Sequence, residues 1–186
     1  MIGAALALAV TLASAPSGEA VASNGCTRWT SEVTPPATIR VLIGTRVVRV
    51  GFALWVARVT SSEWNGVPTQ LRLAGATATK QYGWVKTLHP RHSIYGCFDV
   101  HDDTRDAIYR PKSPPARVWA AVRATWHWRV LREGRLVQTG YRTGSARRCA
   151  ADVDGYHLKA RSAAACARLG WTAGHILERY YGARVQ

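Results

Sequence analysis

Acidic residues are scarce in this chain of 186 residues, which carries 11 Asp and Glu against 25 Lys and Arg. Lysine is also scarce, since 21 of the 25 basic residues are arginines. The net charge of +14 indicates an anionic partner: a nucleic acid, an anionic lipid or an anionic polymer. The low acid count leaves few carboxylates for acid–base catalysis, and the 47% hydrophobic content excludes a disordered basic tail.

Several functional signatures are missing as well. The sequence has no phosphate-binding glycine loop, no serine nucleophile elbow and no zinc finger, helix-turn-helix or RNA-recognition motif. Because the basic residues are dispersed, only the charge favours a nucleic-acid binder, and we expect no nucleic-acid partner. No later segment is apolar enough to span a bilayer, so we expect no membrane contact beyond the N-terminal leader.

The N-terminal residues 2–15 form an apolar run of signal-peptide length. Small-residue cleavage sites follow near Ala15 and Ala22, although no basic residue precedes Arg28. We predict a signal peptide over residues 1–22, a linker over 23–37 and one domain over 38–186. A retained anchor and a buried hydrophobic strand or helix are the alternatives.

The four cysteines form an even set, which suits an oxidising, extracytoplasmic compartment. Three pairings are open, and four free buried thiols are the alternative. We favour Cys149–Cys166, which closes the shortest loop between separate elements. Cys26–Cys97 then follows by elimination.

Hydrophobic periodicity predicts a single compact α+β domain with short strands, a β-hairpin and several helices. In chain order the predicted elements are strands (38–44 and 45–51), helices (52–64 and 69–86), a loop (88–97), extended pieces around an acidic turn (98–111), a helix (117–125), a hairpin (126–131 and 135–141) and two helices (162–169 and 172–181). The first two helices have apolar residues at helical spacing: Phe52, Trp55, Val56 and Val59, then Leu71, Ala74, Ala78, Tyr82 and Val85.

Glu63 is the first candidate for chemistry. It lies in the last turn of the first predicted helix, beside Trp64. A carboxyl group desolvated against an aromatic ring stays protonated and can act as a general acid. The alternative is an ordinary surface glutamate at a helix C-terminus, where the helix dipole disfavours a negative charge. Most tryptophans should pack in the core, but Trp64 and Trp84 end candidate site helices and could stack on sugar rings.

The stretch 89–106 is a second candidate, because it holds several imidazole, thiol and carboxyl groups: His89, His92, Cys97, Asp99, His101, Asp102, Asp103 and Asp106. Cys97 and His101 are candidate zinc ligands, but no paired Cys-x-x-Cys is present. The alternative is a solvated acidic turn that supplies countercharge for nearby arginines.

Three separated stretches resemble the SpoIID/LytB family, the stage II sporulation protein D and amidase-enhancer group. They read VVRVGFALWVARVTSSEW, TQLRLAGATATKQYGWV and CFDVHDDTRDAIYRP, and the chain closes with ARLGWTAGHILERYYGARV. The resemblance covers about residues 40–186, with the motifs in the family's order. Three features depart from it. The proline that often follows the family's Glu closely stands here only at Pro68, Ala107 replaces the Gln of "QxY", and DGYHLKARSAAA replaces "HGxGMSQxGA".

The resemblance implies a secreted or wall-associated lytic transglycosylase that cuts peptidoglycan glycan strands. Glu63 would serve as acid and then as base, leaving 1,6-anhydro ends. The implied substrate-binding residues are Trp64, Lys80, Gln81, Tyr82, Trp84, Asp103, Thr104 and Tyr109. The implied partners are glycan strands, anionic wall polymer and a cell-wall amidase. No cofactor is required, although some members of the family bind zinc. The alternative is a non-catalytic wall-binding or amidase-enhancing module.

Overall fold

The computed structural model describes residues 18–186, so most of the predicted leader lies outside the described residues. The α+β class is confirmed. The helices are α1 (Phe52–Glu63), α2 (Thr69–Leu88), α3 (Ala116–Ala124), α4 (Ala160–Arg168) and α5 (Ala173–Tyr181). Each lies within a few residues of a predicted helix, because helical periodicity is a local signal.

Within residues 18–186, the strands are short and form five small sheets rather than one. They are β1 (Glu19–Val21), β2 (Thr27–Trp29), β3 (Thr38–Ile43), β4 (Arg46–Gly51), β5 (Arg91–Ser93), β6 (Gly96–Phe98), β7 (Val100–His101), β8 (Val130–Arg132), β9 (Arg135–Leu136), β10 (Gly140–Arg142), β11 (His157–Lys159) and β12 (Arg184–Val185). The sheets have the strand orders β1-β2, β4-β3-β7, β5-β6, β12-β8-β9 and β10-β11.

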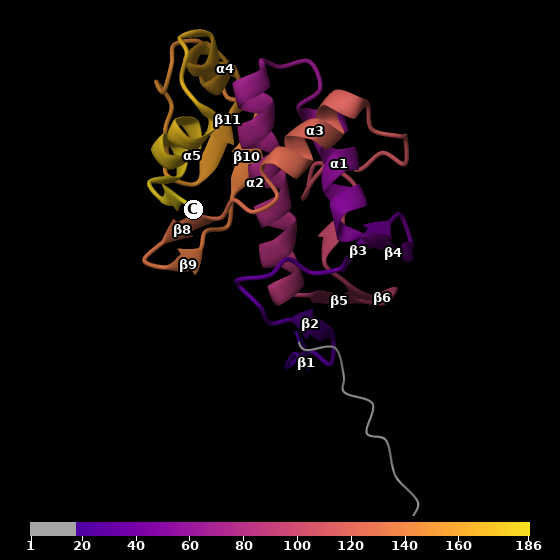
Figure 1. Ribbon diagram of the computed structural model, residues 1–186. Coiled ribbons are helices and arrows are strands. Elements are labelled where there is room, and N and C mark those ends of the chain that lie inside the picture. Colours follow the sequence, from indigo (N-terminus) through magenta and orange to yellow (C-terminus); the bar gives the residue numbers. More distant parts are fainter. Residues whose placement is uncertain (1–17) are drawn as a thin grey trace, which may run out of the picture.

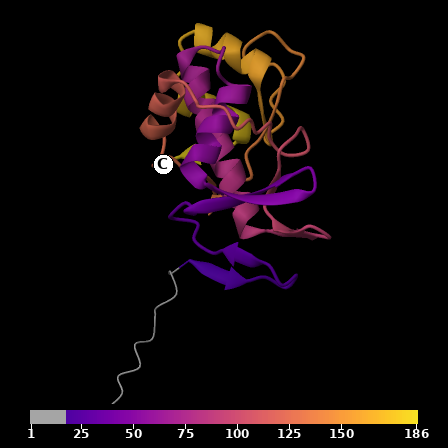
Figure 2. The same ribbon diagram turned by 90° about the vertical axis from the view of Figure 1, so that its right-hand side faces the viewer.

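Helix α2 is the centre of the molecule. It contacts α1, α3, α4 and α5, and all its residues from Ala74 to Val85 are buried (Figures 1 and 2). The predicted face of α2 is buried, but so are its other faces. Periodicity predicts one buried face, and it does not distinguish a surface helix from one that is covered on every side.

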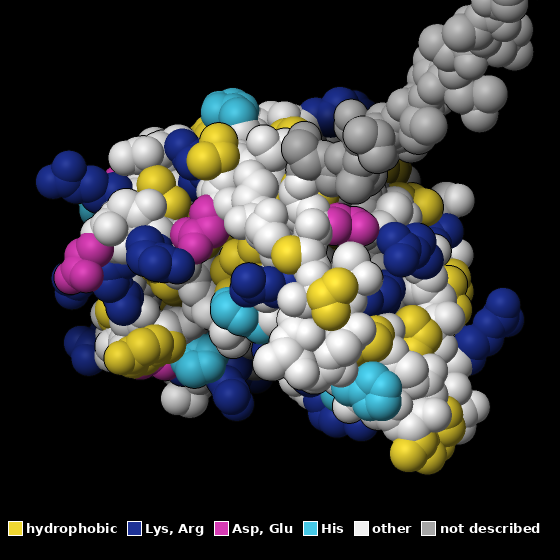
Figure 3. Space-filling view, turned by 90° about the horizontal axis from the view of Figure 1, so that it is seen from below, with side chains coloured by type: hydrophobic (Ala, Val, Ile, Leu, Met, Phe, Trp, Pro, Cys, Tyr) yellow, Lys and Arg dark blue, Asp and Glu magenta, His cyan; other side chains and the backbone are white. Residues whose placement is uncertain are grey.

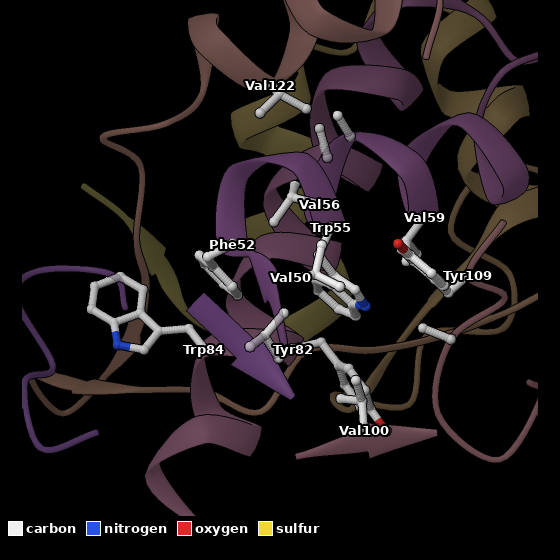
Figure 4. Packing of buried hydrophobic residues seen from close by; sticks show 14 of the residues in the cluster. Val50, Phe52, Trp55, Val56, Val59, Tyr82, Trp84, Val100, Tyr109 and Val122 are labelled. Atoms are coloured by element: carbon white, nitrogen blue, oxygen red, sulfur yellow. The ribbon is translucent and has the colours of Figure 1, made fainter. Parts of the chain in front are cut away.

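Glycines in α2 allow α1 to pack closely against it. A Cβ atom at Gly75 would lie within 2.8 Å of three carbons of the Trp64 indole, and one at Gly83 within 2.8 Å of two carbons of Trp55. Because the earlier tryptophan meets the later glycine, the two helices run antiparallel. The predicted apolar face of α1 is buried in the same core (Figure 4). This packing places Glu63, at the end of α1, beside the start of α2.

The N-terminal segment is attached to the domain. Strands β1 and β2 form an antiparallel hairpin that includes part of the predicted linker, and Cys26 is disulfide-bonded to Cys97. The Trp84 indole N–H donates to the carbonyl of Ser31 at 2.8 Å. Cleavage after Ala22 would therefore remove β1, whereas cleavage after Ala15 would leave the hairpin intact.

Both favoured disulfides are confirmed, since Cys149 also pairs with Cys166. Two disulfides are consistent with a secreted protein. Among residues 18–186, no helix has the length and apolarity needed to cross a bilayer.

Two predicted segments differ from the structure. The predicted loop 88–97 contains β5 and most of β6, which form a hairpin. The second strand of the predicted hairpin, 135–141, is divided: β9 pairs with β8, whereas β10 pairs in parallel with the distant β11. A parallel partner far along the chain leaves no local sequence signal.

Candidate functional site

Glu63 lines a cavity of about 240 Å³ where three chain segments meet. The segments are the end of α1, the loop after β7, and β10 with the start of α4. The lining residues are Glu63, Trp64, Thr104, Asp106, Ala107, Ile108, Tyr141, Arg142, Thr143 and Ala160. Glu63 thus lies in a hollow rather than on a convex surface, and residues from the segment between Asp99 and Tyr109 line the same hollow.

The Glu63 carboxyl group is partly buried and held in one orientation. Its Oε1 accepts a hydrogen bond from the Ile108 backbone N–H at 3.0 Å. Burial raises the pKa of Glu63, and this effect outweighs the opposing influence of the Ile108 N–H and the Arg110 charge. A raised pKa increases the protonated fraction near neutral pH, which is the state that a general acid requires.

Asp106 is the other carboxylate of the cavity, and it is fully engaged. Its Oδ1 accepts from the Tyr82 hydroxyl at 2.7 Å, while Oδ2 accepts from the His101 backbone N–H at 2.8 Å and pairs with Arg91. Burial opposes ionisation of Asp106, but the hydrogen bonds, led by that from Arg91, hold its pKa well below the usual range. With its side chain only 1% exposed, Asp106 fixes the loop and leaves Glu63 as the accessible carboxyl group.

Tyr141 is a cavity residue that the sequence reasoning missed. Its hydroxyl is fully buried, close to the side chain of Thr79. The ring lies edge-on to Trp64 and Tyr82, at centroid distances of 5.4 and 6.1 Å. Burial, and next the nearby charge of Glu63, raise the pKa of Tyr141 well above its ordinary value, so the hydroxyl stays a neutral hydrogen-bond donor.

Only part of the predicted substrate-binding set meets at this cavity. Trp64 and Thr104 line it with Glu63, and Tyr82 reaches it through Asp106. Trp84 instead packs against the N-terminal segment. Tyr109 accepts a hydrogen bond from Arg58, and Asp103 forms an exposed ion pair with Arg105.

Lys80 and Gln81 lie in the interior and bind backbone groups. The Lys80 ammonium donates to the carbonyls of Thr125 at 3.1 Å and Trp126 at 2.7 Å. The Gln81 amide both donates to and accepts from Val130, at 2.7 Å each. These two side chains hold the segment that follows α3, and neither lines the Glu63 cavity.

The residues suggested for zinc do not form a ligand set. Cys97 is consumed in a disulfide, and the His101 Nδ1 atom lies 2.8 Å from Asp106 Oδ2. Within residues 18–186, no group of three or more His, Cys, Asp or Glu side chains is arranged to hold a metal ion.

Comparison with known proteins adds no assignment to this geometry. No protein-family model matches the chain, and no curated protein sequence matches it.

Proposed function

We propose that this protein cleaves peptidoglycan glycan strands by a lytic transglycosylase reaction in which Glu63 is first the general acid and then the base. One observation carries the proposal: a partly buried carboxyl group with a raised pKa lines an open cavity whose other carboxylate is sequestered. The motif resemblance of the sequence to the SpoIID/LytB family points to the same residue and gives the substrate class.

The chemistry needs a single accessible carboxyl group. Protonated Glu63 donates its proton to the glycosidic oxygen, the leaving strand departs, and an oxocarbenium-like centre develops at C1. The resulting Glu63 carboxylate then takes the proton of the 6-hydroxyl of the same sugar. The freed oxygen bonds to C1 and closes a 1,6-anhydro ring, so no second carboxylate has to activate water and no cofactor is required.

Neighbouring groups support these roles. The Ile108 N–H fixes one oxygen of Glu63 and leaves the other for the substrate. The buried Tyr141 side chain lines the cavity beside Glu63 and helps to keep the Glu63 carboxyl group partly out of water. Trp64 is only 1% exposed, so we assign it to packing behind Glu63 rather than to stacking on a sugar.

The test is the variant Glu63→Gln, which keeps the size of the side chain and removes the transferable proton. We expect the wild-type protein to release 1,6-anhydro ends from purified glycan strands, detected by mass spectrometry, and Glu63→Gln to bind glycan without releasing them. Glu133→Gln, in the exposed β8–β9 turn, is the matched control and should retain activity. Absence of anhydro ends with the wild-type protein, while a positive-control enzyme produces them, would refute catalysis.

A basic surface favours the alternative, a non-catalytic wall-binding or amidase-enhancing module. Lys and Arg side chains are spread over the face that carries β1 and β2, with few acidic side chains among them (Figure 3). In that case wild type and Glu63→Gln would bind wall polymer equally and in a salt-sensitive way. Both would also stimulate a cell-wall amidase to the same extent.

A further inference from the structure

Two basic depressions adjoin the Glu63 cavity, and each shares a different lining residue with it. The first has a volume of about 410 Å³ and shares Ala160 with the cavity. Its charged residues, which we call the α4 patch, are Arg147, Arg161 and Arg168. The second has a volume of about 300 Å³ and shares Ile108 with the cavity.

The α4 patch is built by helical spacing. Arg161 and Arg168 are seven residues apart in α4, so they lie on one face of the helix. Arg147 comes from the loop before β11 and completes the group. Figure 1 shows α4 beside the end of α2 at which that helix begins, which is also the end where α1 finishes.

The second depression carries Arg110 and Lys112, which we call the loop patch, beside Arg58. All five side chains of the two patches are exposed. Among the described residues, none of the five takes part in an ion pair, although arginines elsewhere pair with Asp99, Asp103 and Asp106. Like charges gathered without counter-ions repel each other, so an anionic ligand is favoured on both patches.

We propose that the α4 patch and the loop patch bind carboxylate groups of one glycan strand, on the two sides of the bond that lies at Glu63. This inference rests on the proposed function, because that function identifies the polymer in the cavity. Each depression shares a lining residue with the Glu63 cavity, Ala160 or Ile108, so a strand seated at Glu63 lies close to both patches. Guanidinium groups bind carboxylates through paired N–H donors, which makes arginine suited to this task.

The apolar floor of the first depression indicates what the acidic group is attached to. Val67, Ala160 and Ala164 lie among the arginines of the α4 patch. A carboxylate next to a methyl group would place its charge on the arginines and its methyl group on these side chains. The lactyl ether of a muramic acid residue has this chemistry.

The experiment compares variants that lose equal charge. Arg147→Gln, Arg161→Gln and Arg168→Gln are combined in one protein, and the control combines Arg46→Gln, Arg123→Gln and Arg184→Gln, which line none of the three hollows. Anhydro-end release is measured on glycan strands with free carboxylates and on the same strands after conversion of the carboxylates to methylamides. Because exposed ion pairs are individually weak, we expect loss of the α4 patch to raise KM about tenfold, with kcat retained.

The control triple should change KM less than about twofold, because its charges are screened from the strand at physiological salt. Because amidation removes the ligands of both patches, amidated strands should raise the wild-type KM more than the α4 substitutions do. The KM of the α4 variant should rise further on amidated strands only by the smaller contribution of the loop patch. Lys112→Gln alone should give a smaller rise of the same kind; Arg110 is left in place because its charge also acts on the pKa of Glu63. Equal KM changes in the α4 and control triple variants would overturn the proposal, because the net charge of the protein would then explain the effect.

Binding separates this inference from the proposed function. If no protein releases anhydro ends, the same variants are compared by co-sedimentation with the two glycans. Binding that needs both the α4 patch and free carboxylates supports the subsites although catalysis has failed. Cleavage that is indifferent to the patch and to amidation refutes the subsites and leaves the role of Glu63 standing.

Discussion

Replacing Gly75 by alanine is expected to destabilise the protein through the Trp64 indole. The new Cβ would lie within 2.8 Å of three indole carbons, closer than such atoms pack. Trp64 is 1% exposed, and its Nε1–H donates to the Thr79 hydroxyl at 3.3 Å, so the ring has no free space into which it can move. Relief of the clash therefore requires a shift of α1 relative to α2.

The magnitude follows from two opposing effects. Alanine is better than glycine in a helix interior by about 1 kcal/mol. Overpacking of a close-packed interior costs about 1–3 kcal/mol, and we take the upper end because a rigid indole and a helix backbone are in contact. The net loss is about 2 kcal/mol, which corresponds to a fall in Tm of about 4–8 °C for a chain of this size.

The assay is urea and thermal unfolding followed by circular dichroism with the disulfides intact. Gly174→Ala in α5 is the matched control, because nothing lies within 4 Å of its added Cβ, and it should be neutral or stabilising by up to about 1 kcal/mol. Trp64→Leu should reduce the effect of Gly75→Ala in a double-mutant cycle. A Gly75→Ala protein as stable as Gly174→Ala would contradict the close helix contact on which the position of Glu63 depends.

Two further predictions concern pH and the disulfides. Because Glu63 must be protonated to act, kcat/KM for anhydro-end release should fall as pH rises through its raised pKa. The same raised pKa gives stability that is fully present below the unfolded-state pKa of Glu63 and is lost as pH rises through its folded-state pKa. The difference in unfolding free energy between wild type and Glu63→Gln should therefore decline over this pH range. A difference that does not change with pH would argue against desolvation of Glu63. Replacing Cys26 and Cys97 by alanine should lower the free energy of unfolding by about 4 kcal/mol, and replacing Cys149 and Cys166 should lower it by about 3 kcal/mol. The first disulfide closes the longer loop, with a sequence separation of 71 against 17, and so removes more entropy from the unfolded chain. Equal losses in urea unfolding would contradict the loop-entropy explanation.

The local part of the fold follows from the sequence. Helices α1 and α2 have apolar residues at helical spacing, and the turn at Gly44 separates two alternating strands. The predicted helix 52–64 ends within one residue of the observed end of α1 at Glu63. The disulfides follow from the sequence only as the favoured one of three pairings, because the shortest loop between separate elements favours Cys149–Cys166 without excluding the others. These features depend on residues close in sequence, or on simple counting.

The tertiary structure alone decided which side chains surround Glu63. Tyr141 and Asp106 reach the cavity from segments far apart in the chain, and the Tyr141 segment is placed by a parallel pairing of β10 with β11 that has no local signature. Lys80 and Gln81 belong to a motif that predicted substrate contact, yet α2 is covered on every side and buries both of them. Sequence periodicity thus determined where Glu63 falls on its helix. Its raised pKa depends on burial by distant segments, which only the folded chain brings together.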